Sequence, residues 1–236
     1  MQHFALTFAI LAGTSVAMPT QLKGRNGDSY TFYQGDGSTN AGWPSQDQWS
    51  SYNDLWNANV PLMQQSCGWN GWGDNDSADE INSIQNAIQT QASSTGLDAR
   101  FILAIMMQES KGCVRVPTTN NGVRNPGLMQ DHDGSGTCND NGNVQNPCPD
   151  YEIAQMIADG AAGTSQGDGL QQTQSQAQSA TGDNGSRAYY AAARLYNSGS
   201  ADYSNLDNGL GSTPCYASDV ANRLTGWTLA ASNCQA

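Results

Sequence analysis

The feature that most constrains the fold is an uninterrupted apolar run, Phe101-Ile102-Leu103-Ala104-Ile105-Met106-Met107. A helix with this sequence is apolar nearly all round, so it has no face for solvent and must be covered by other elements. Asp98 is a candidate N-cap before the run, and Gly112 follows it as a stop signal. The sequence therefore predicts a central, buried helix from Ala99 to about Ser110.

Amphipathic helices are predicted on both sides of this central helix. Capping-box patterns begin at Ser45 and Ser77, and each precedes an apolar stripe at helical spacing. Pro61 is expected to end the first of these helices and Gly96 the second. Three more helices are expected at residues 151–159, 188–196 and 216–227. The Gln/Ser/Gly-rich tract 164–185 could be helical or mobile.

The remaining segments are rich in turn-forming residues. Asn, Gly, Pro and Asp dominate residues 114–150, which predicts long loops or a small β-hairpin region. Residues 18–44 lack helical periodicity and are expected to form an irregular N-terminal arm, followed by a folded domain over residues 45–236. The expected fold class is mainly α (α+β), with a small hairpin region, long loops and disulfides.

The first residues have the pattern of a secretory signal peptide. In Met1–Ala17 an apolar run is followed by the small-residue ending Ser15-Val16-Ala17. No later stretch approaches the roughly 18 consecutive apolar residues that a membrane span needs. We therefore expect a secreted, extracellular protein.

All six cysteines follow that segment, and an even number in an exported chain predicts three disulfides. The count leaves the connectivity open. Proximity in the sequence favours Cys138 with Cys148 and Cys215 with Cys234, which leaves Cys67 with Cys113. Scattered cysteines and a single retained histidine do not form a zinc ligand set, so we expect no metal and no cofactor.

The chain is acidic but carries few charges. Nine Lys and Arg against 21 Asp and Glu give a net charge of −12, and charged residues make up only 13% of the chain. Binding to nucleic acid or to a membrane surface is therefore disfavoured, and attraction to anionic bacterial surfaces should be weak. The chain is expected to be monomeric.

Glu109 is the candidate catalytic acid. It ends the predicted central helix, where burial and the negative end of the helix dipole both favour the protonated carboxyl. A carboxyl that stays protonated near neutral pH can protonate a glycosidic oxygen. The alternative is an ordinary helix-end glutamate that is solvated or paired with Arg115.

The segment Gly127–Asp133 supplies candidate partners for this acid. Its mixture of apolar and polar residues predicts an extended or hairpin strand that could direct Gln130 and an aspartate toward Glu109. Hydrolysis with inversion needs a second carboxylate across the sugar. Asp131 and Asp133 are the candidates, and each could instead be a solvated turn residue.

Three motifs occur in order along the chain. They are Ala104-Ile105-Met106-Met107-Gln108-Glu109-Ser110, Gly127-Leu128-Met129-Gln130 and Ala193-Arg194-Leu195-Tyr196-Asn197-Ser198-Gly199. Together they resemble the motifs of the lysozyme-like superfamily of soluble lytic transglycosylases and goose-type lysozymes, over about residues 78–227. Residues 30–73 also resemble a region of secreted fungal lysozyme-like proteins.

The resemblance implies a general-acid role for Glu109 and a substrate cleft built from the three motifs. The implied cleft residues are Ser110, Met129, Gln130, Tyr196 and Asn197. Asp131 lies one position from the aspartate with which goose-type lysozymes position water. Transglycosylases lack that second carboxylate, so the resemblance mildly favours hydrolysis.

Aromatic residues are concentrated near the N-terminus, where five of the six tryptophans lie between Trp43 and Trp72. Helical spacing indicates that Trp49 and Trp56 are core residues. Trp69 and Trp72 lie in a Gly/Asn-rich stretch and are the better candidates for stacking on sugars.

These observations predict a secreted muramidase-type glycosidase that cleaves β-1,4 bonds between N-acetylated hexosamines, with peptidoglycan as the first candidate substrate. The alternatives are a lytic transglycosylase, an enzyme that cleaves chitin or chitosan, and a secreted glycan-binding protein without activity. The single retained histidine, His132, has no nucleophile-elbow motif beside it, which argues against a serine hydrolase.

Overall fold

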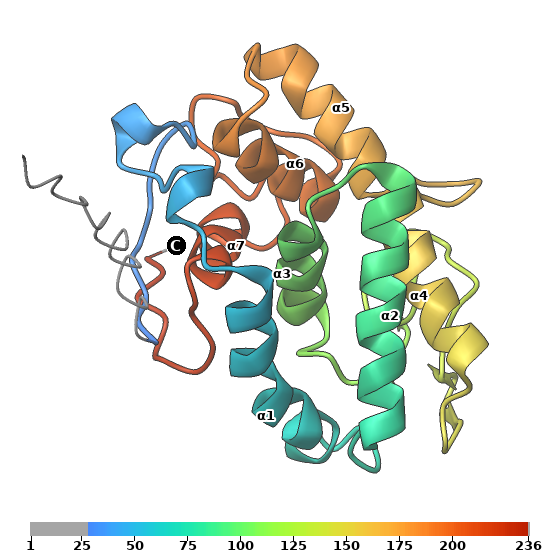
Figure 1. The fold of residues 1–236 in the computed structure, drawn as a ribbon. Coiled ribbons are helices and arrows are strands. Elements are labelled where there is room, and N and C mark those ends of the chain that lie inside the picture. Colours follow the sequence, from blue (N-terminus) through green and yellow to red (C-terminus); the bar gives the residue numbers. More distant parts are fainter. Residues whose placement is uncertain (1–27, 236) are drawn as a thin grey trace, which may run out of the picture.

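The computed structural model describes residues 28–235, and within this range seven α-helices are accompanied by two short hairpins (Figure 1). The helices are α1 (Tyr52–Asn70), α2 (Ala78–Thr95), α3 (Ala99–Glu109), α4 (Asp150–Ala162), α5 (Leu170–Thr181), α6 (Ser186–Ser198) and α7 (Tyr216–Leu224). The prediction of a mainly α chain is confirmed. The predicted signal peptide, Met1–Ala17, lies outside the described residues.

Helix α3 is central, as its sequence predicts. All seven residues of the apolar run are buried, and the helix packs against α1, α2 and α7 (Figure 1). The Asp98 carboxylate caps the helix by accepting a hydrogen bond from the Arg100 backbone N–H at 2.9 Å. Because α3 is enclosed on all sides, the end of this helix fixes the position of Glu109 within the molecule.

Helix α1 differs from the prediction at both ends. The segment after Ser45 forms a short 3-10 helix, Gln46–Gln48, and the α-helix begins only after its N-cap, Ser51. Pro61 was expected to end the helix, but α1 continues to Asn70. An interior proline costs about 3 kcal/mol. Beyond it the helix buries Leu62 and Met63, each worth about 1.5–3 kcal/mol, which offsets that cost.

Helix α2 has the boundaries that the sequence predicts. The Ser77 hydroxyl accepts from the Glu80 backbone N–H at 3.2 Å, and the Glu80 carboxylate accepts from the Ser77 N–H at 2.7 Å. This is the complete capping box. At the other end Gly96 adopts a left-handed conformation with φ of 76°, which ends the helix at little steric cost.

The Gln/Ser/Gly-rich tract 164–185 is helical over residues 170–181. It forms α5, which packs against α6 and α4 and buries residues along one face. A close backbone approach precedes it: a β-carbon on Gly169 would stand 2.2 Å from the Gly163 backbone nitrogen. Only glycine fits there, and this contact places α5 beside the end of α4.

Within residues 28–235 the β structure consists of two antiparallel hairpins. Strand β1 (Thr119–Asn120) pairs with β2 (Arg124–Asn125), and β3 (Asn139–Asp140) pairs with β4 (Asn143–Val144). The prediction of a small hairpin region within residues 114–150 is therefore confirmed.

The predicted strand over residues 127–133 is absent from the structure. Residues 127–130 instead form a turn, in which the Gln130 N–H donates to the Gly127 carbonyl at 3.1 Å. Leu128 and Met129 are both fully buried, so neighbouring side chains do not alternate between core and solvent as they would in a strand. A strand here would form hydrogen bonds to a neighbouring strand but would expose one of these two side chains. The turn forms no such strand pairing and buries both side chains.

The three disulfides predicted from sequence proximity are present. They join Cys67 to Cys113, Cys138 to Cys148 and Cys215 to Cys234. The first ties α1 to the loop after α3, and the second closes the loop that contains the β3–β4 hairpin. In a chain-entropy account each link of this kind contributes about 2–4 kcal/mol.

The described part of the N-terminal arm lies along α7. The Thr31 N–H donates to the Asn222 side chain at 2.7 Å, and the Tyr33 N–H donates to the Ser218 hydroxyl at 3.0 Å. Trp43 is buried at the end of the arm, with its indole N–H on the Gln34 carbonyl at 2.7 Å. The residues from 28 onward therefore belong to the same packed unit as the helices.

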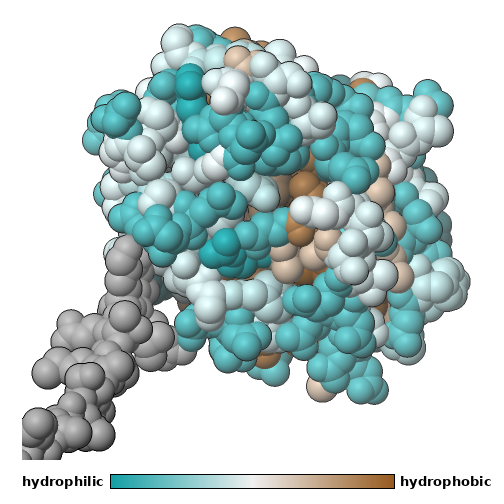
Figure 2. Space-filling view, turned by 45° about the horizontal axis from the view of Figure 1, so that its top comes forward, coloured by the Kyte–Doolittle hydropathy of each residue, from teal (hydrophilic) through white to brown (hydrophobic). Residues whose placement is uncertain are grey.

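The surface is polar, as the composition predicts. On the face drawn in Figure 2, hydrophilic residues cover most of the surface and hydrophobic residues are visible mainly in a central hollow. Within residues 28–235, no helix combines the length and the apolar character that crossing a membrane requires.

Candidate active site

Two cavities meet at the ends of α3 and α6. One, of about 630 Å³, is lined by Glu109, and the other, of about 660 Å³, is lined by Asp131. They are called here the Glu109 cavity and the Asp131 cavity. Four residues line both: Asn125, Gln130, Tyr196 and Asn197. The two cavities are therefore adjacent parts of one polar cleft.

Glu109 occupies the end of α3 and is half-buried. Burial raises the pKa of its carboxyl to about 7, whereas the hydrogen bond from Tyr216 and the charges of Lys111 and Arg223 act in the opposite direction. The Tyr216 hydroxyl donates to Glu109 Oε1. A carboxyl of this kind carries a proton near neutral pH while one oxygen is held in place from α7.

A set of polar side chains between α3 and α7 supports Glu109. The Arg223 guanidinium donates to the Gln108 side chain at 2.8 Å, and the Gln108 amide donates to Asp219 at 3.0 Å. Lys111 donates to the Gln108 carbonyl at 3.0 Å, and burial together with Arg223 lowers the pKa of this lysine to about 7. These bonds fix the C-terminal end of α3 relative to α7.

Arg115, the alternative partner of Glu109 in the sequence interpretation, lies elsewhere. Its guanidinium pairs with Glu80 and, at 3.3 Å, with Asp76. All three side chains are buried at the start of α2. Their pairing leaves Glu109 without an arginine salt bridge in the described part of the chain.

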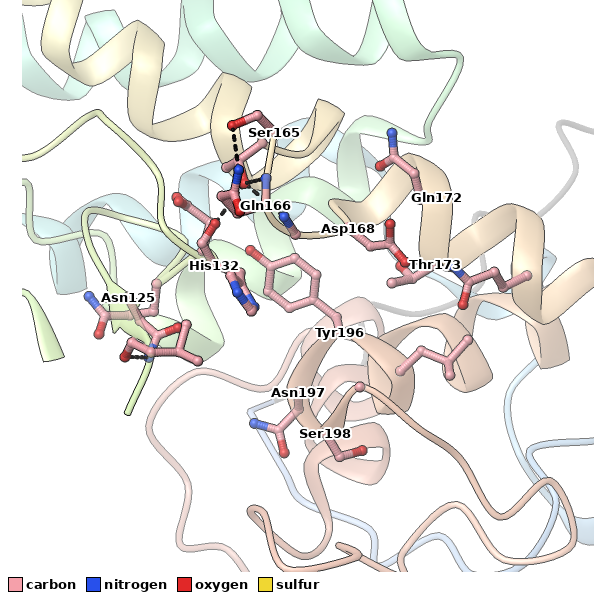
Figure 3. A pocket seen from close by; sticks show the side chains of 18 residues that line it. Asn125, His132, Ser165, Gln166, Asp168, Gln172, Thr173, Tyr196, Asn197 and Ser198 are labelled. Atoms are coloured by element: carbon pink, nitrogen blue, oxygen red, sulfur yellow. Dashed lines mark hydrogen bonds between the residues drawn. The ribbon is translucent and has the colours of Figure 1, made fainter. Parts of the chain in front are cut away.

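Tyr196 and Asn197 stand on the common wall of the two cavities, at the end of α6. Tyr196 lies in the middle of the view in Figure 3, and its hydroxyl donates to the Met129 carbonyl at 2.9 Å. On the same helix the fully buried Arg194 donates to the Asn197 side-chain oxygen and, at 2.9 Å, to the Thr213 carbonyl. One buried cation thus positions two parts of the cleft wall.

Gln130 lies in the turn that replaces the predicted strand, with φ of 46°. Its side-chain oxygen accepts from the Thr119 hydroxyl at 3.0 Å, and its amide nitrogen donates to the Gly127 carbonyl at 3.0 Å. The side chain is held by the protein's own groups on both sides. It therefore forms a fixed edge of both cavities.

Asp131 is the second acidic group of the cleft. It is 3% exposed, and burial followed by the charge of Asp159 raises the pKa of its carboxyl to about 8. Asp133, the other sequence candidate, is exposed and is not among the residues that line either cavity. The structure thus brings Asp131, and not Asp133, to the cleft.

Four of the predicted substrate-binding side chains lie outside the lining of these two cavities. Ser110 is fully buried and donates to the Met106 carbonyl at 3.0 Å, so it serves the end of α3. Met129 is fully buried and contributes only its carbonyl, to Tyr196. Trp69 is exposed and Trp72 half-buried at the C-terminal end of α1.

The structure adds cleft residues that the sequence interpretation did not identify. The far wall of the Asp131 cavity comes from the loop before α5 and from α5 itself, including Gln166, Asp168, Gln172 and Thr173 (Figure 3). These residues lie in the low-complexity tract, whose composition carries no signal for a site. Tyr216 was expected only as the first residue of a helix.

One set of three potential metal ligands occurs among the described residues, Cys67, Asp76 and Cys113. The two cysteines form a disulfide and so offer no thiolate. The Asp76 carboxylate accepts from the Val114 N–H at 3.2 Å and pairs with Arg115. These side chains are therefore structural.

The hydrogen bond from Tyr216 can be tested directly. Because this bond lowers the pKa of Glu109, Tyr216→Phe should raise that pKa above about 7. An NMR titration that follows the Glu109 side-chain carboxyl measures the change. Tyr203→Phe, on the loop after α6, is a control that should leave the Glu109 titration where it is. A pKa that falls in Tyr216→Phe would contradict the role given to this bond.

The chain was compared with protein-family models, with curated proteins and with solved structures, and none of the three comparisons gave a match.

Proposed function

We propose that this protein is a secreted glycosidase that cleaves β-1,4 bonds in polymers of N-acetylated hexosamines such as peptidoglycan or chitin, with Glu109 as the general acid. The observation that carries the proposal is the position of the Glu109 carboxyl together with its raised pKa. Its carboxyl lines an open cleft, is fixed by Tyr216 and has its pKa raised to about 7. A general acid for glycoside cleavage must be protonated at working pH and reach the leaving oxygen.

The lining of the cleft supports a sugar polymer as the substrate. Beside Glu109, the first cavity presents the hydroxyls and amides of Thr119, Asn121, Asn125 and Asn197. The second continues this lining with side chains from α5. Such groups both donate and accept hydrogen bonds, as the hydroxyl and acetamido groups of a hexosamine do. Two adjoining cavities accommodate a chain of several rings more readily than one small molecule.

In the proposed reaction Glu109 transfers its proton to the glycosidic oxygen while the bond between that oxygen and C1 breaks. The positive charge that develops at C1 is then captured by water or by the acetamido oxygen of the substrate. Capture by water yields a new reducing end, and the proton released from the water restores the carboxyl of Glu109 or passes to solvent.

A second reaction type has one observation in its favour. The raised pKa of Asp131 keeps this carboxyl neutral at neutral pH, where a neutral carboxyl cannot take a proton from water. Capture by the acetamido oxygen needs no second carboxylate. The 6-hydroxyl of the same muramyl residue would then attack C1, the bond between C1 and the acetamido oxygen would break, and the hydroxyl proton would pass to the Glu109 carboxylate, which leaves a 1,6-anhydro end. Mass spectrometry of the products separates the two, because reducing ends support hydrolysis and anhydro ends support transglycosylation.

The pH dependence of cleavage tests the role of Glu109. Since the acid form is the active form, kcat should fall about tenfold per pH unit above a midpoint near the Glu109 pKa of about 7. The rate is measured as new chain ends released from a soluble N-acetylhexosamine oligomer. An oligomer without ionisable groups is the appropriate substrate, because its own charge then does not change. A rate that rises steadily through this range would contradict a general acid at Glu109.

A further inference from the structure

One of the two cavities that form the cleft lies away from the proposed catalytic acid. The Asp131 cavity has a volume of about 660 Å³, and Glu109 is not among the residues that line it. It adjoins the Glu109 cavity along a common wall that includes Tyr196 and Asn197. A volume of this size is typical of sites that enclose a drug-sized ligand. A polymer bound at Glu109 can therefore continue into a second compartment, in which no bond is cleaved.

The far wall of this compartment is fixed by contacts on both sides. The Thr164 hydroxyl donates to the His132 carbonyl at 2.7 Å, which joins the loop before α5 to the opposite wall of the cavity. The Gln172 side chain accepts from the Gly169 N–H at 3.0 Å and donates to the Ala162 carbonyl at 2.8 Å. These bonds hold the start of α5 against the end of α4. A wall that is already ordered loses little conformational entropy when a ligand binds, which favours binding.

Two side chains on this wall offer polar groups to a ligand. Asp168 and Gln176 line the cavity, and both are exposed. The Gln176 amide nitrogen donates to Asp168 Oδ2 at 2.6 Å, which orients the pair. The second carboxylate oxygen and the amide oxygen can accept hydrogen bonds from the hydroxyl groups of a sugar. In Figure 3, Asp168 lies on one side of Tyr196 and His132 on the other, so both walls of the cavity present polar side chains.

We propose that Asp168 and Gln176 bind sugar residues of the substrate that lie away from the bond being cleaved, so that long chains are cleaved faster than short ones. This inference rests on the proposed glycosidase function for the nature of the ligand. Asp131 contributes no carboxylate oxygen to this contact, because both of these oxygens are buried. Binding energy gained away from the reacting bond can lower the barrier to cleavage. A chain that fills both cavities should therefore be a better substrate than one that fills only the Glu109 cavity.

Cleavage rates of oligomers of increasing length test this preference. The substrates are β-1,4-linked oligomers of N-acetylglucosamine, from the dimer to the hexamer, and kcat/KM is measured for each. We expect kcat/KM to rise about tenfold or more from the shortest oligomer that the wild-type chain cleaves to the hexamer. Equal values of kcat/KM at all cleaved lengths would overturn the inference, because no ring beyond the Glu109 cavity would then contribute.

Two variants of the far wall assign the effect to its residues. Gln176→Ala and Asp168→Ala should each lower kcat/KM for the hexamer about threefold to tenfold. Neither should change kcat/KM for the shortest cleaved oligomer, because that chain does not reach the pair. Gln171→Ala is the matched control, since Gln171 is exposed on the same helix and lies outside the lining of both cavities. A merely structural role of the pair would lower both values equally, and that result would contradict the inference.

Binding measurements separate this inference from the proposed function. Isothermal titration calorimetry of the hexamer with Glu109→Gln protein needs no turnover, and Gln176→Ala is then added to the same background. If the wild-type chain cleaves no oligomer, but the hexamer binds and Gln176→Ala weakens its binding, the contact with the far wall stands and the catalytic proposal fails. If the wild-type chain cleaves the hexamer and Gln176→Ala changes neither its cleavage nor its binding, the glycosidase stands and this contact fails. Absence of hexamer binding to Glu109→Gln protein would also overturn the inference.

Discussion

Replacing Glu109 with glutamine is expected to slow glycosidic cleavage by about 100- to 10,000-fold, the usual contribution of a general acid. The amide has nearly the same shape as the carboxyl but has no acidic proton to give to the leaving oxygen. Tyr216 can still donate its hydroxyl hydrogen to the amide oxygen of the variant. The substitution should therefore remove the chemical step while preserving the cleft.

The measurement is the release of chain ends from a hexosamine oligomer, with binding of the same oligomer measured in parallel. The double variant Gln108→Glu with Glu109→Gln provides an informative comparison. It keeps one carboxyl but places it one residue earlier, on a side chain directed at Asp219 and Arg223, and it should not restore activity. Equal activity in wild type and Glu109→Gln would exclude Glu109 as the acid, whatever the substrate.

The stability of Glu109→Gln should depend on pH in a defined direction. Glu109 has a higher pKa in the folded chain than the roughly 4.3 of an unfolded glutamate, so the folded state holds this proton more tightly. That contribution is present below the unfolded pKa and is lost as the pH rises through the folded value. Glutamine does not titrate. The free energy of unfolding of the variant should therefore rise relative to that of wild type as the pH increases from about 4 to about 7.

Replacing Arg115 with alanine is expected to produce the largest loss of stability, about 3–5 kcal/mol. The guanidinium is 1% exposed and lies between Asp76 and Glu80, which are also buried. Its removal leaves two carboxylates in a site shielded from water, where backbone N–H groups such as those of Val114 and Cys148 replace no part of the lost positive charge. It also removes the bond to Asn146, which connects this cluster to the loop after β4.

Chemical unfolding at pH 7 with the disulfides intact measures this loss. Arg124→Ala serves as the matched control because Arg124 pairs with Asp140 at 3.1 Å on the surface, where the two side chains are 30% and 34% exposed. Exposed pairs of this kind contribute about 0–1 kcal/mol. Similar losses in both variants would contradict the assignment of Arg115 to a buried network. Burial raises the pKa of Asp76 to about 7, so this carboxylate takes up a proton and loses its charge below neutral pH. The loss of unfolding free energy in Arg115→Ala should therefore come closer to that in Arg124→Ala as the pH falls.

Local sequence signals predicted much of the helical framework because helix caps and apolar periodicity act over a few residues. Ser77 and Gly96 bound α2 as expected, and the run from Phe101 to Met107 forms a buried helix. The failures arose where distant contacts outweighed local preference. Pro61 did not end α1, and the segment from Gly127 became a turn because both Leu128 and Met129 are buried.

The sequence by itself determined that Glu109 ends a helix with no solvent-facing side, and this follows from seven consecutive apolar residues. Only the tertiary structure decided which groups meet that carboxyl. Tyr216 comes from a helix more than 100 residues away, and the far wall of the cleft comes from a tract whose composition gave no signal. Asp131 and Asp133 were both candidates for the second carboxylate, and only Asp131 is buried beside the cleft. Burial, which raises the pKa of Asp131 to about 8, depends on what packs over a residue and not on its neighbours in the sequence.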